Sequence, residues 1–123
     1  MNESHVKSVT INGYTYHIAP NMNVWRAEAK RRWDFIDGWW HYDDFIHWHH
    51  VAGRYGILKH MIENSCPMSE SLHIYEKCGD KRYSDKVHEE AKDMILTYFN
   101  ADLYNRLMEI QRKEKFNPTK MKV

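Results

Sequence analysis

A chain of 123 residues has the length of one ordinary domain and can bury about two-thirds of the surface that its unfolded form would expose. Its 18 basic and 17 acidic side chains leave a net charge of +1, which excludes the excess of Lys and Arg that is typical of general phosphate-backbone binders. Two cysteines exclude a secreted disulfide scaffold, and the lack of a signal core or of roughly 18 consecutive apolar residues predicts a cytoplasmic domain without membrane contact.

The N-terminal segment predicts a β-hairpin over residues 8–18. Two β-rich runs flank Asn12-Gly13, a pair that suits the positive φ angles of a tight type I′ turn. Beyond the hairpin, Asn23 is expected to cap an amphipathic helix over residues 24–37. This helix is predicted from apolar residues that recur at steps of three or four, namely Trp25, Ala29, Trp33 and Ile36.

Residues 42–62 combine a long apolar stripe with the densest histidine cluster of the chain. The apolar positions recur at steps of three or four, which is the spacing that lines one side of an α-helix. The stripe predicts a central core helix, although Gly53 and Gly56 would each weaken it by up to about 1 kcal/mol relative to alanine. The residues of the stripe are Phe45, Trp48, Ala52, Tyr55, Leu58 and Ile62.

The rest of the chain predicts an irregular middle segment followed by two helices. Residues 64–83 contain Pro67 among small polar residues, a composition that is typical of a loop. Ser84 or Asp85 is expected to cap the first helix and Asn100 the second. Together with the hairpin, these elements predict an α+β single domain in which an N-terminal β-hairpin packs on a bundle of three to four α-helices. The predicted boundaries are 85–99 and 101–114 for the helices and 117–123 for a flexible tail.

One set of polar residues on the predicted central helix is a candidate site for a divalent metal ion. Asp43, His47 and His50 would stand at i, i+4 and i+7, on the face opposite the apolar stripe. Carboxylate and imidazole groups bind Zn, Mn or Fe, and the alternative is that these side chains are solvated or face a partner. A separate candidate is a tetrahedral Zn site made of His60, Cys66, His73 and Cys78. The alternative is that the two cysteines are simply buried thiols.

A second set of polar residues resembles the spacing of His-Asn-His metal nucleases. His49-His50 is followed by Asn64, fourteen positions after His50, and by His73 nine positions beyond that. The resemblance implies a ββα unit in place of a central helix, with one divalent metal ion. It implies that one histidine of the leading pair, His50 or His49, activates water, that the other binds the metal, and that His73 is a further ligand. It also implies that the asparagine braces the fold, while Ser65 stands where that family has a hydrophobic residue.

Aromatic residues are concentrated between residues 25 and 55, beyond what one pair of helices can easily enclose. Because Trp, Tyr and Arg dominate binding hot spots, part of this surface is a candidate protein interface, and a core that is unusually rich in rings is the alternative. The predicted interface comprises Trp25, Arg32, Trp33, Trp39, Trp40, Tyr42, His47, His50 and Arg54.

The sequence therefore predicts a non-enzymatic protein without a cofactor that acts by stoichiometric binding. The expected partner is a protein or a protein–nucleic acid complex, as for a phage-type accessory inhibitor of a host nuclease or RNA–protein complex. A homodimer seam is a second use for the same surface, whereas the balanced charge does not favour direct nucleic-acid binding. The alternative function is the divalent-metal-dependent nuclease, with His49, His50, Asn64 and His73 as its site.

Overall fold

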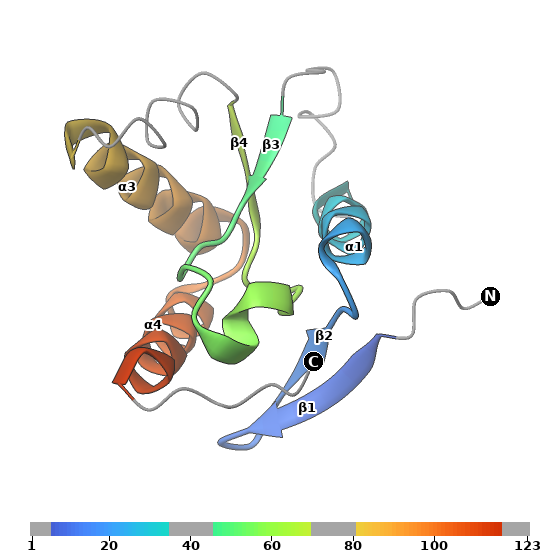
Figure 1. The fold of residues 1–123 in the computed structure, drawn as a ribbon. Coiled ribbons are helices and arrows are strands. Elements are labelled where there is room, and N and C mark those ends of the chain that lie inside the picture. Colours follow the sequence, from blue (N-terminus) through green and yellow to red (C-terminus); the bar gives the residue numbers. More distant parts are fainter. Residues whose placement is uncertain (1–5, 35–45, 70–80, 117–123) are drawn as a thin grey trace.

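The computed structural model describes residues 6–34, 46–69 and 81–116 of the chain. The elements in these ranges are β1 (Lys7–Ile11), β2 (Tyr14–Ile18), α1 (Met22–Asp34), β3 (Ile46–His49), the 3-10 helix η2 (Gly56–His60), β4 (Cys66–Ser69), α3 (Lys81–Tyr98) and α4 (Ala101–Phe116). The β3–β4 pair lies between α1 on one side and α3 on the other, and the β1–β2 hairpin lies at one end of the molecule (Figure 1). The predicted α+β class with an N-terminal β-hairpin is confirmed.

The β1–β2 hairpin turns at the predicted Asn12-Gly13 pair. Asn12 has a φ of 52° and Gly13 a φ of 85°, as a type I′ turn requires. On β2, Tyr16 and Ile18 point into the core because side chains alternate along a strand. An isolated bridge between Ile18 and Met61 joins the hairpin to the segment that follows η2. The hairpin is therefore part of the same packed unit as the central strands.

Helix α1 begins two residues earlier than predicted, because Asn21 rather than Asn23 is its N-cap. The Oδ1 atom of Asn21 accepts a hydrogen bond of 2.9 Å from the backbone N–H of Val24, which satisfies a donor that the first helical turn leaves unpaired. The predicted end of this helix at residue 37 lies outside the described residues. The face turned to the core is 0% exposed and consists of Trp25, Ala29 and Trp33.

The predicted helix over residues 42–62 is wrong. Residues 46–49 form β3, residues 56–60 form η2, and β3 pairs with β4 in an antiparallel register. Gly53 has a φ of 80° and Gly56 a φ of 50°, and a left-handed backbone at these two positions interrupts any α-helix through the stretch. Residues of the apolar stripe such as Leu58 are buried, but they reach the core from a folded loop rather than from one helical face.

Strand β4 also replaces part of the predicted irregular segment at residues 64–83. Pro67 lies in this strand opposite Trp48, although its presence predicts a loop. A proline has no N–H to donate to a neighbouring strand. Within the described residues the β3–β4 sheet has only two strands, so one edge of β4 forms no hydrogen bonds to another strand and can accommodate Pro67. Residues 81–83 belong to α3, and residues 70–80 lie outside the described residues.

Helices α3 and α4 confirm the two predicted C-terminal helices, with shifted ends. Helix α3 starts at Lys81, so neither Ser84 nor Asp85 is its N-cap. Asn100 caps α4 as predicted, because its Oδ1 atom accepts a hydrogen bond of 2.8 Å from the N–H of Leu103. Within the described ranges, no helix combines the length and the hydrophobicity that crossing a lipid bilayer requires.

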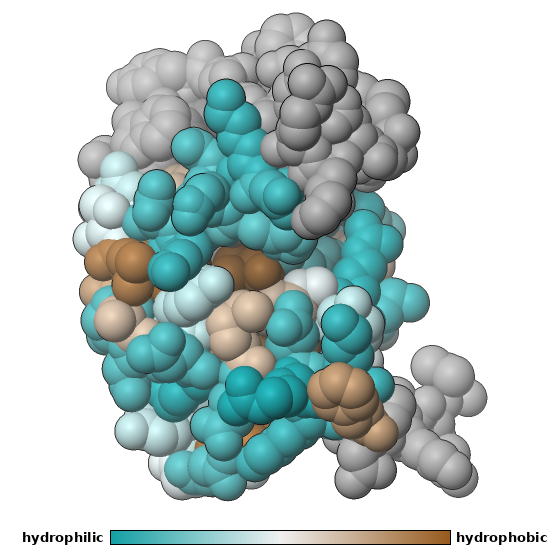
Figure 2. All heavy atoms as spheres, turned by 90° about the vertical axis from the view of Figure 1, so that its left-hand side faces the viewer, coloured by the Kyte–Doolittle hydropathy of each residue, from teal (hydrophilic) through white to brown (hydrophobic). Residues whose placement is uncertain are grey.

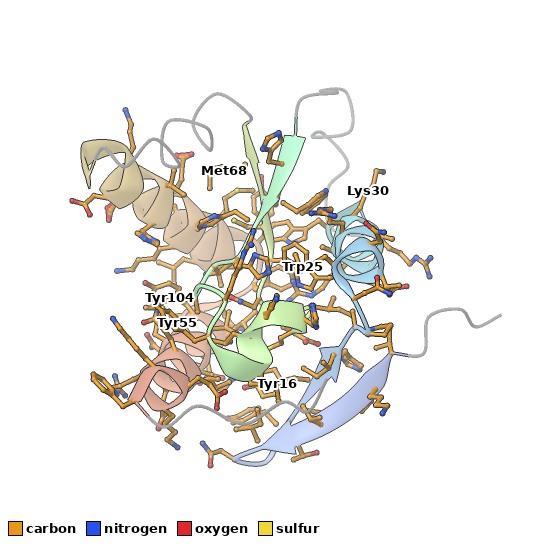
Figure 3. All side chains as sticks on the ribbon, in the orientation of Figure 1. Tyr16, Trp25, Lys30, Tyr55, Met68 and Tyr104 are labelled. Atoms are coloured by element: carbon orange, nitrogen blue, oxygen red, sulfur yellow. The ribbon has the colours of Figure 1, made fainter. Side chains whose placement is uncertain are left out.

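Most buried side chains form one hydrophobic cluster around the β3–β4 pair. It receives Tyr16 from β2, Leu58 from η2 and Met68 from β4. Trp48 of β3 packs against this cluster and against a second, smaller one that contains Trp25 of α1. Figure 3 shows Trp25 between α1 and the strand pair. The helices α3 and α4 contribute Val87, Ala91, Ile95, Leu103, Leu107 and Ile110.

Candidate active site

The loop between β3 and β4 is organised around the side chain of Asn64. Its Oδ1 atom accepts a hydrogen bond of 2.7 Å from the N–H of Ala52, and its Nδ2 group donates to the carbonyl oxygens of Gly53 at 2.9 Å and of Leu58 at 3.0 Å. Asn64 is 0% exposed, so these bonds replace the water that the backbone groups would otherwise need. The strand pair and the bracing asparagine are both features that the resemblance to His-Asn-His nucleases implies.

Helix α4 supports the same loop from a distant part of the chain. The Oε1 atom of Glu114 accepts a hydrogen bond of 3.0 Å from the N–H of Ile57, 57 positions away. The Nε2 group of Gln111 donates one of 3.2 Å to the carbonyl oxygen of Ala52. The buried carboxylate of Glu114 also lies directly against Gly56. The shape of the loop therefore depends on α4 as well as on Asn64.

We expect Gly56→Ala to lower the free energy of unfolding by about 2–3 kcal/mol. A Cβ atom at residue 56 would overlap the carboxylate of Glu114, and the φ of 50° would strain any side chain there. Urea unfolding followed by tryptophan fluorescence measures the difference. Gly13→Ala is the matched control, because Gly13 has a φ of 85° but open space around it, and it should cost about 1 kcal/mol. Equal losses in the two variants would contradict the close packing of Glu114.

His50 follows directly after β3, and its ring is held on two sides. Its Nε2 atom lies 2.9 Å from the carbonyl oxygen of Lys59 in η2. Because a carbonyl oxygen only accepts, this contact assigns the ring proton to Nε2 and leaves a lone pair on Nδ1. The ring also stacks on Trp25 of α1, with centres 4.0 Å apart and planes 1° from parallel. Trp25 is itself fixed, since its Nε1 group donates a hydrogen bond of 2.8 Å to the carbonyl oxygen of Met61.

The surroundings of His50 keep its imidazole uncharged at neutral pH. Burial lowers the pKa of His50 from its ordinary value of 6.5 to about 4, because this residue is only 4% exposed and its ring loses the water that would stabilise the charged form. The hydrogen bond to Lys59 raises the pKa, while the charges of Arg54, His60 and Arg26 lower it. A neutral imidazole can accept a proton, and the positive charges beside it attract phosphate groups.

His49, the last residue of β3, lies close to α3. The centre of its ring is 6.1 Å from that of the His88 ring, and the two planes make an angle of 57°. His49 is 7% exposed, whereas His88 is exposed on the surface of α3. Imidazole is a common ligand of divalent metals. Over the parts of the chain that the structure describes, however, no three or more His, Cys, Asp or Glu side chains gather in a ready-made metal site.

The structure does not assemble either of the other two predicted metal sites from the described residues. Without a helix over residues 42–62, His47 and His50 do not share a helical face, so that part of the prediction is wrong. Cys66 is buried, and burial is the main cause that raises the pKa of its thiol and keeps it protonated, a poor state for metal binding. The remaining predicted ligands, Asp43, His73 and Cys78, lie outside the described residues.

The predicted aromatic interface is not a single surface. Trp25 and Trp33 are each 0% exposed, so the prediction that they contact a partner is wrong. Each indole instead donates a hydrogen bond to a backbone carbonyl, that of Trp33 reaching the oxygen of Ser65 at 3.1 Å. The face of the molecule that carries α3 and α4 is mostly hydrophilic, with hydrophobic side chains in small separate groups (Figure 2). Core packing accounts for these two rings.

The other interface residues are distributed between partly buried and exposed positions. Arg32 is half-buried, with its guanidinium carbon 4.0 Å from the centre of the Phe99 ring. Burial is the main cause that lowers the pKa of Arg32 to about 10, so the side chain stays charged at neutral pH. His47 is half-buried, and Arg54 is exposed. The rest of the predicted interface, Trp39, Trp40 and Tyr42, lies outside the described residues.

Comparisons with protein-family models, with curated proteins and with solved structures find no match for this chain. Its candidate active site is therefore defined by geometry, and three contributions to it are not apparent from the sequence. They are the Lys59 carbonyl that holds His50, the stacking of Trp25 and the approach of His88. The first belongs to the backbone, and the other two come from helices that only the fold brings to β3. No local sequence pattern signals them.

Proposed function

We propose that this chain is a divalent-metal-dependent nuclease that resembles the His-Asn-His enzymes. The observation that carries the proposal is the ring of His50, whose Nε2 atom is anchored to the Lys59 carbonyl and whose Nδ1 atom keeps its lone pair. The ring stands at the end of β3, in a strand–loop–strand unit braced by Asn64. An oriented neutral histidine on a rigid loop supports hydrolysis of a phosphodiester bond.

In the proposed reaction His50 is the general base. Its Nδ1 atom takes a proton from a water molecule while the water oxygen attacks phosphorus. A new P–O bond forms as the bond from phosphorus to the leaving oxygen breaks, and the leaving oxygen takes a proton from solvent. The contacts with Lys59 and Trp25 keep the ring from rotating, so the lone pair stays aimed at one position.

The resemblance also implies a metal ion, and the ligands that it implies are imidazoles, a donor type that suits a divalent ion. His49 offers an imidazole at the end of β3, adjacent in the chain to the proposed base. His73, the other ligand that the resemblance implies, lies outside the described residues. When bound, a divalent ion supplies charge neutralisation for the phosphate and the leaving oxygen.

The charges near His50 support a nucleic acid as the substrate. Arg54 and Arg26 are exposed, and both lie close enough to His50 to lower its pKa. Lys59, in the same loop, is exposed as well. Guanidinium and ammonium groups bind phosphate oxygens, and several of them beside one base can hold a phosphodiester backbone in place. Because the net charge of the chain is only +1, we expect this binding to be local to the site.

Incubation of the purified protein with plasmid DNA and with single-stranded RNA tests the proposal. We expect cleavage of at least one substrate in the presence of Mg²⁺, Mn²⁺, Ni²⁺ or Zn²⁺, and none after removal of metals with a chelator. Cells that carry the empty vector, taken through the same purification, control for contaminating nucleases. Absence of cleavage with every metal and both substrates would falsify the proposal.

The stoichiometric binding function expected from the sequence stays a prediction. Arg32, His47 and Arg54 are the described residues of the predicted interface that retain exposed or partly exposed side chains, whereas Trp25, Trp33 and His50 are buried. The two functions differ in an observable way, because an inhibitor or adaptor forms a complex of fixed stoichiometry with its partner and leaves nucleic acids intact. The cleavage assay therefore separates them.

A further inference from the structure

We propose that Tyr55, in the loop between β3 and β4, is a stacking platform for an unpaired base of a single-stranded nucleic acid. This inference rests on the proposed function and deepens it, because it names the class of substrate that the site near His50 takes. The ring of Tyr55 belongs to a large, partly apolar side chain that is 39% exposed. It lies among basic groups on the same loop that carries the proposed base.

The Tyr55 ring is exposed, but the fold restricts its position. The ring lies so close to the backbone of Gly53 that a Cβ atom at residue 53 would come within 2.9 Å of its Cε2 atom. The carbonyl oxygen of Tyr55 accepts a hydrogen bond of 2.9 Å from the N–H of Leu58, which fixes the backbone at this point. The side chain lies on the side of the loop that faces α4 (Figure 3). A ring held in this way loses little freedom when a planar base stacks on it.

Basic side chains lie around this ring. The Nζ atom of Lys115, in the last turn of α4, is 5.7 Å from the ring centre. This distance is near the outer limit of about 6 Å for attraction between a cation and an aromatic face, so the contact is weak. Lys115 is exposed and can turn its ammonium group to a phosphate instead. Arg54 and Lys59, in the same loop as Tyr55, are exposed as well.

Acidic groups of the loop and of the last turn of α4 do not offset these charges. Residues 51–62 contain no Asp or Glu. The last turn of α4 contains Glu114, but this residue is buried and its carboxylate accepts a hydrogen bond from the N–H of Ile57. Single strands bind to surfaces of this kind, because their phosphates pair with the cations while their bases stack on the ring. The charge of the surface therefore favours a nucleic acid as its occupant.

Arg54 connects the Tyr55 ring to the proposed base. It precedes Tyr55 in the chain, and its charge is near enough to His50 to act on that imidazole. Lys59, which follows Tyr55 by four residues, is in contact with the His50 ring through its carbonyl oxygen. When Arg54 holds one phosphate of a strand, a neighbouring nucleotide can lay its base on the ring. The bases of a duplex are already stacked on one another, so the arrangement selects a single strand.

Binding of a fluorescein-labelled oligothymidylate of about 12 nucleotides to the full chain tests the inference. A chelator is present, so that binding is measured without cleavage, and fluorescence anisotropy gives the dissociation constant at low ionic strength. A second oligomer has abasic sites in place of its thymidines and thus keeps the phosphates without the bases. We expect the wild type to bind the thymidylate about 10-fold more tightly than the abasic strand, as is usual for one stacked base, and also more tightly than a duplex.

Three variants of exposed tyrosines locate the effect. Tyr55→Ala is expected to bind the thymidylate about 10-fold more weakly than the wild type and to lose the preference over the abasic strand. Tyr55→Phe keeps the aromatic face and should bind as the wild type does. Tyr14→Ala is the matched control and should leave binding unchanged. Tyr14 is 46% exposed and lies 4.0 Å from the guanidinium carbon of Arg106, but it belongs to the β1–β2 hairpin.

The outcomes separate this inference from the proposed function. A wild-type chain that binds neither strand, or binds both with equal affinity, would overturn the inference whether or not the protein cleaves nucleic acids. A folded Tyr55→Ala protein that still prefers the thymidylate would overturn it too. Loss of the preference in Tyr55→Ala alone would support it even if no nuclease activity were found. Circular dichroism checks the fold of the variant, which keeps the backbone carbonyl that Leu58 binds.

Discussion

Replacement of His50 by glutamine is expected to lower the rate of metal-dependent nucleic-acid cleavage by about 10²–10⁴-fold, the usual contribution of a positioned general base. Glutamine can still donate a hydrogen bond to the Lys59 carbonyl, but its amide cannot take a proton from water at neutral pH. The loss should fall on kcat, because the nearby Arg54 and Arg26 remain to bind the phosphodiester backbone. Steady-state kinetics on a labelled oligonucleotide measures kcat and KM separately.

The matched control for this variant is His17→Gln. His17 is exposed on β2, where its Nδ1 atom lies 2.6 Å from a carboxylate oxygen of Glu63, and it is not part of the proposed machinery. The His17→Gln variant also replaces an imidazole by an amide, and it should leave kcat within about twofold of wild type. His50→Ala adds a second test, although the cavity beside Trp25 should also lower stability. A folded His50→Gln protein that cleaves at the wild-type rate would remove His50 from the mechanism.

Replacement of Asn64 by alanine is expected to lower the free energy of unfolding by about 3–5 kcal/mol. The change leaves the N–H of Ala52 and the carbonyl oxygens of Gly53 and Leu58 without their partner. Each unsatisfied buried group costs about 1–3 kcal/mol, and the site is 0% exposed, so water cannot readily replace the lost amide. Since ordinary domains have only about 5–15 kcal/mol of stability, this single side chain should decide whether the loop is folded. Urea unfolding gives the difference.

Two further variants sharpen that measurement. Asn64→Asp keeps the acceptor for the N–H of Ala52 but loses both donors and buries a charge, so we expect it to be at least as destabilising as alanine. Asn105→Ala, at an exposed position of α4, is the control and should be neutral or slightly stabilising because alanine favours a helix. A loss below about 1 kcal/mol for Asn64→Ala would mean that the loop does not depend on this residue.

Elements whose signals are local could be predicted from the sequence. The Asn12-Gly13 turn and the Asn100 cap each depend on the conformation of a few adjacent residues, and both are found as predicted. The start of α1 was displaced by two residues because Asn21 and Asn23 are equally suitable caps in isolation. Short-range rules therefore predict the hairpin turn and the Asn100 cap, but they leave the starts of α1 and α3 uncertain by a few residues.

The central segment could not be predicted in the same way. The apolar stripe through residues 42–62 has helical spacing, but the loop is shaped by Asn64 and by Glu114, which lies 57 positions from Ile57. Such contacts stabilise positive φ angles at Gly53 and Gly56, and a window of neighbouring residues contains no sign of them. Tertiary hydrogen bonds thus outweigh a local preference that sums to a few kcal/mol at most.

The candidate site could be predicted in part. Spacing alone brought together His49, His50 and Asn64, and the bracing contacts of Asn64 agree with what the resemblance implies. Spacing could not decide which histidine to propose as the base, because that choice depends on the contact between His50 and the Lys59 carbonyl. Nor could it suggest His88, whose approach to His49 follows from the packing of α3. The role of a histidine depends on how its ring is oriented, and only the three-dimensional structure shows that orientation.

The support that α4 gives to the histidine loop has a consequence for the order of events during synthesis. Gln111 and Glu114 bind backbone groups that are made 59 and 57 residues earlier. We expect a nascent polypeptide that still lacks α4 to leave those groups open to water, so the loop should reach its final shape only after α4 has left the ribosome. The site that we propose around His50 should therefore be assembled late in translation, after α4 has been synthesised.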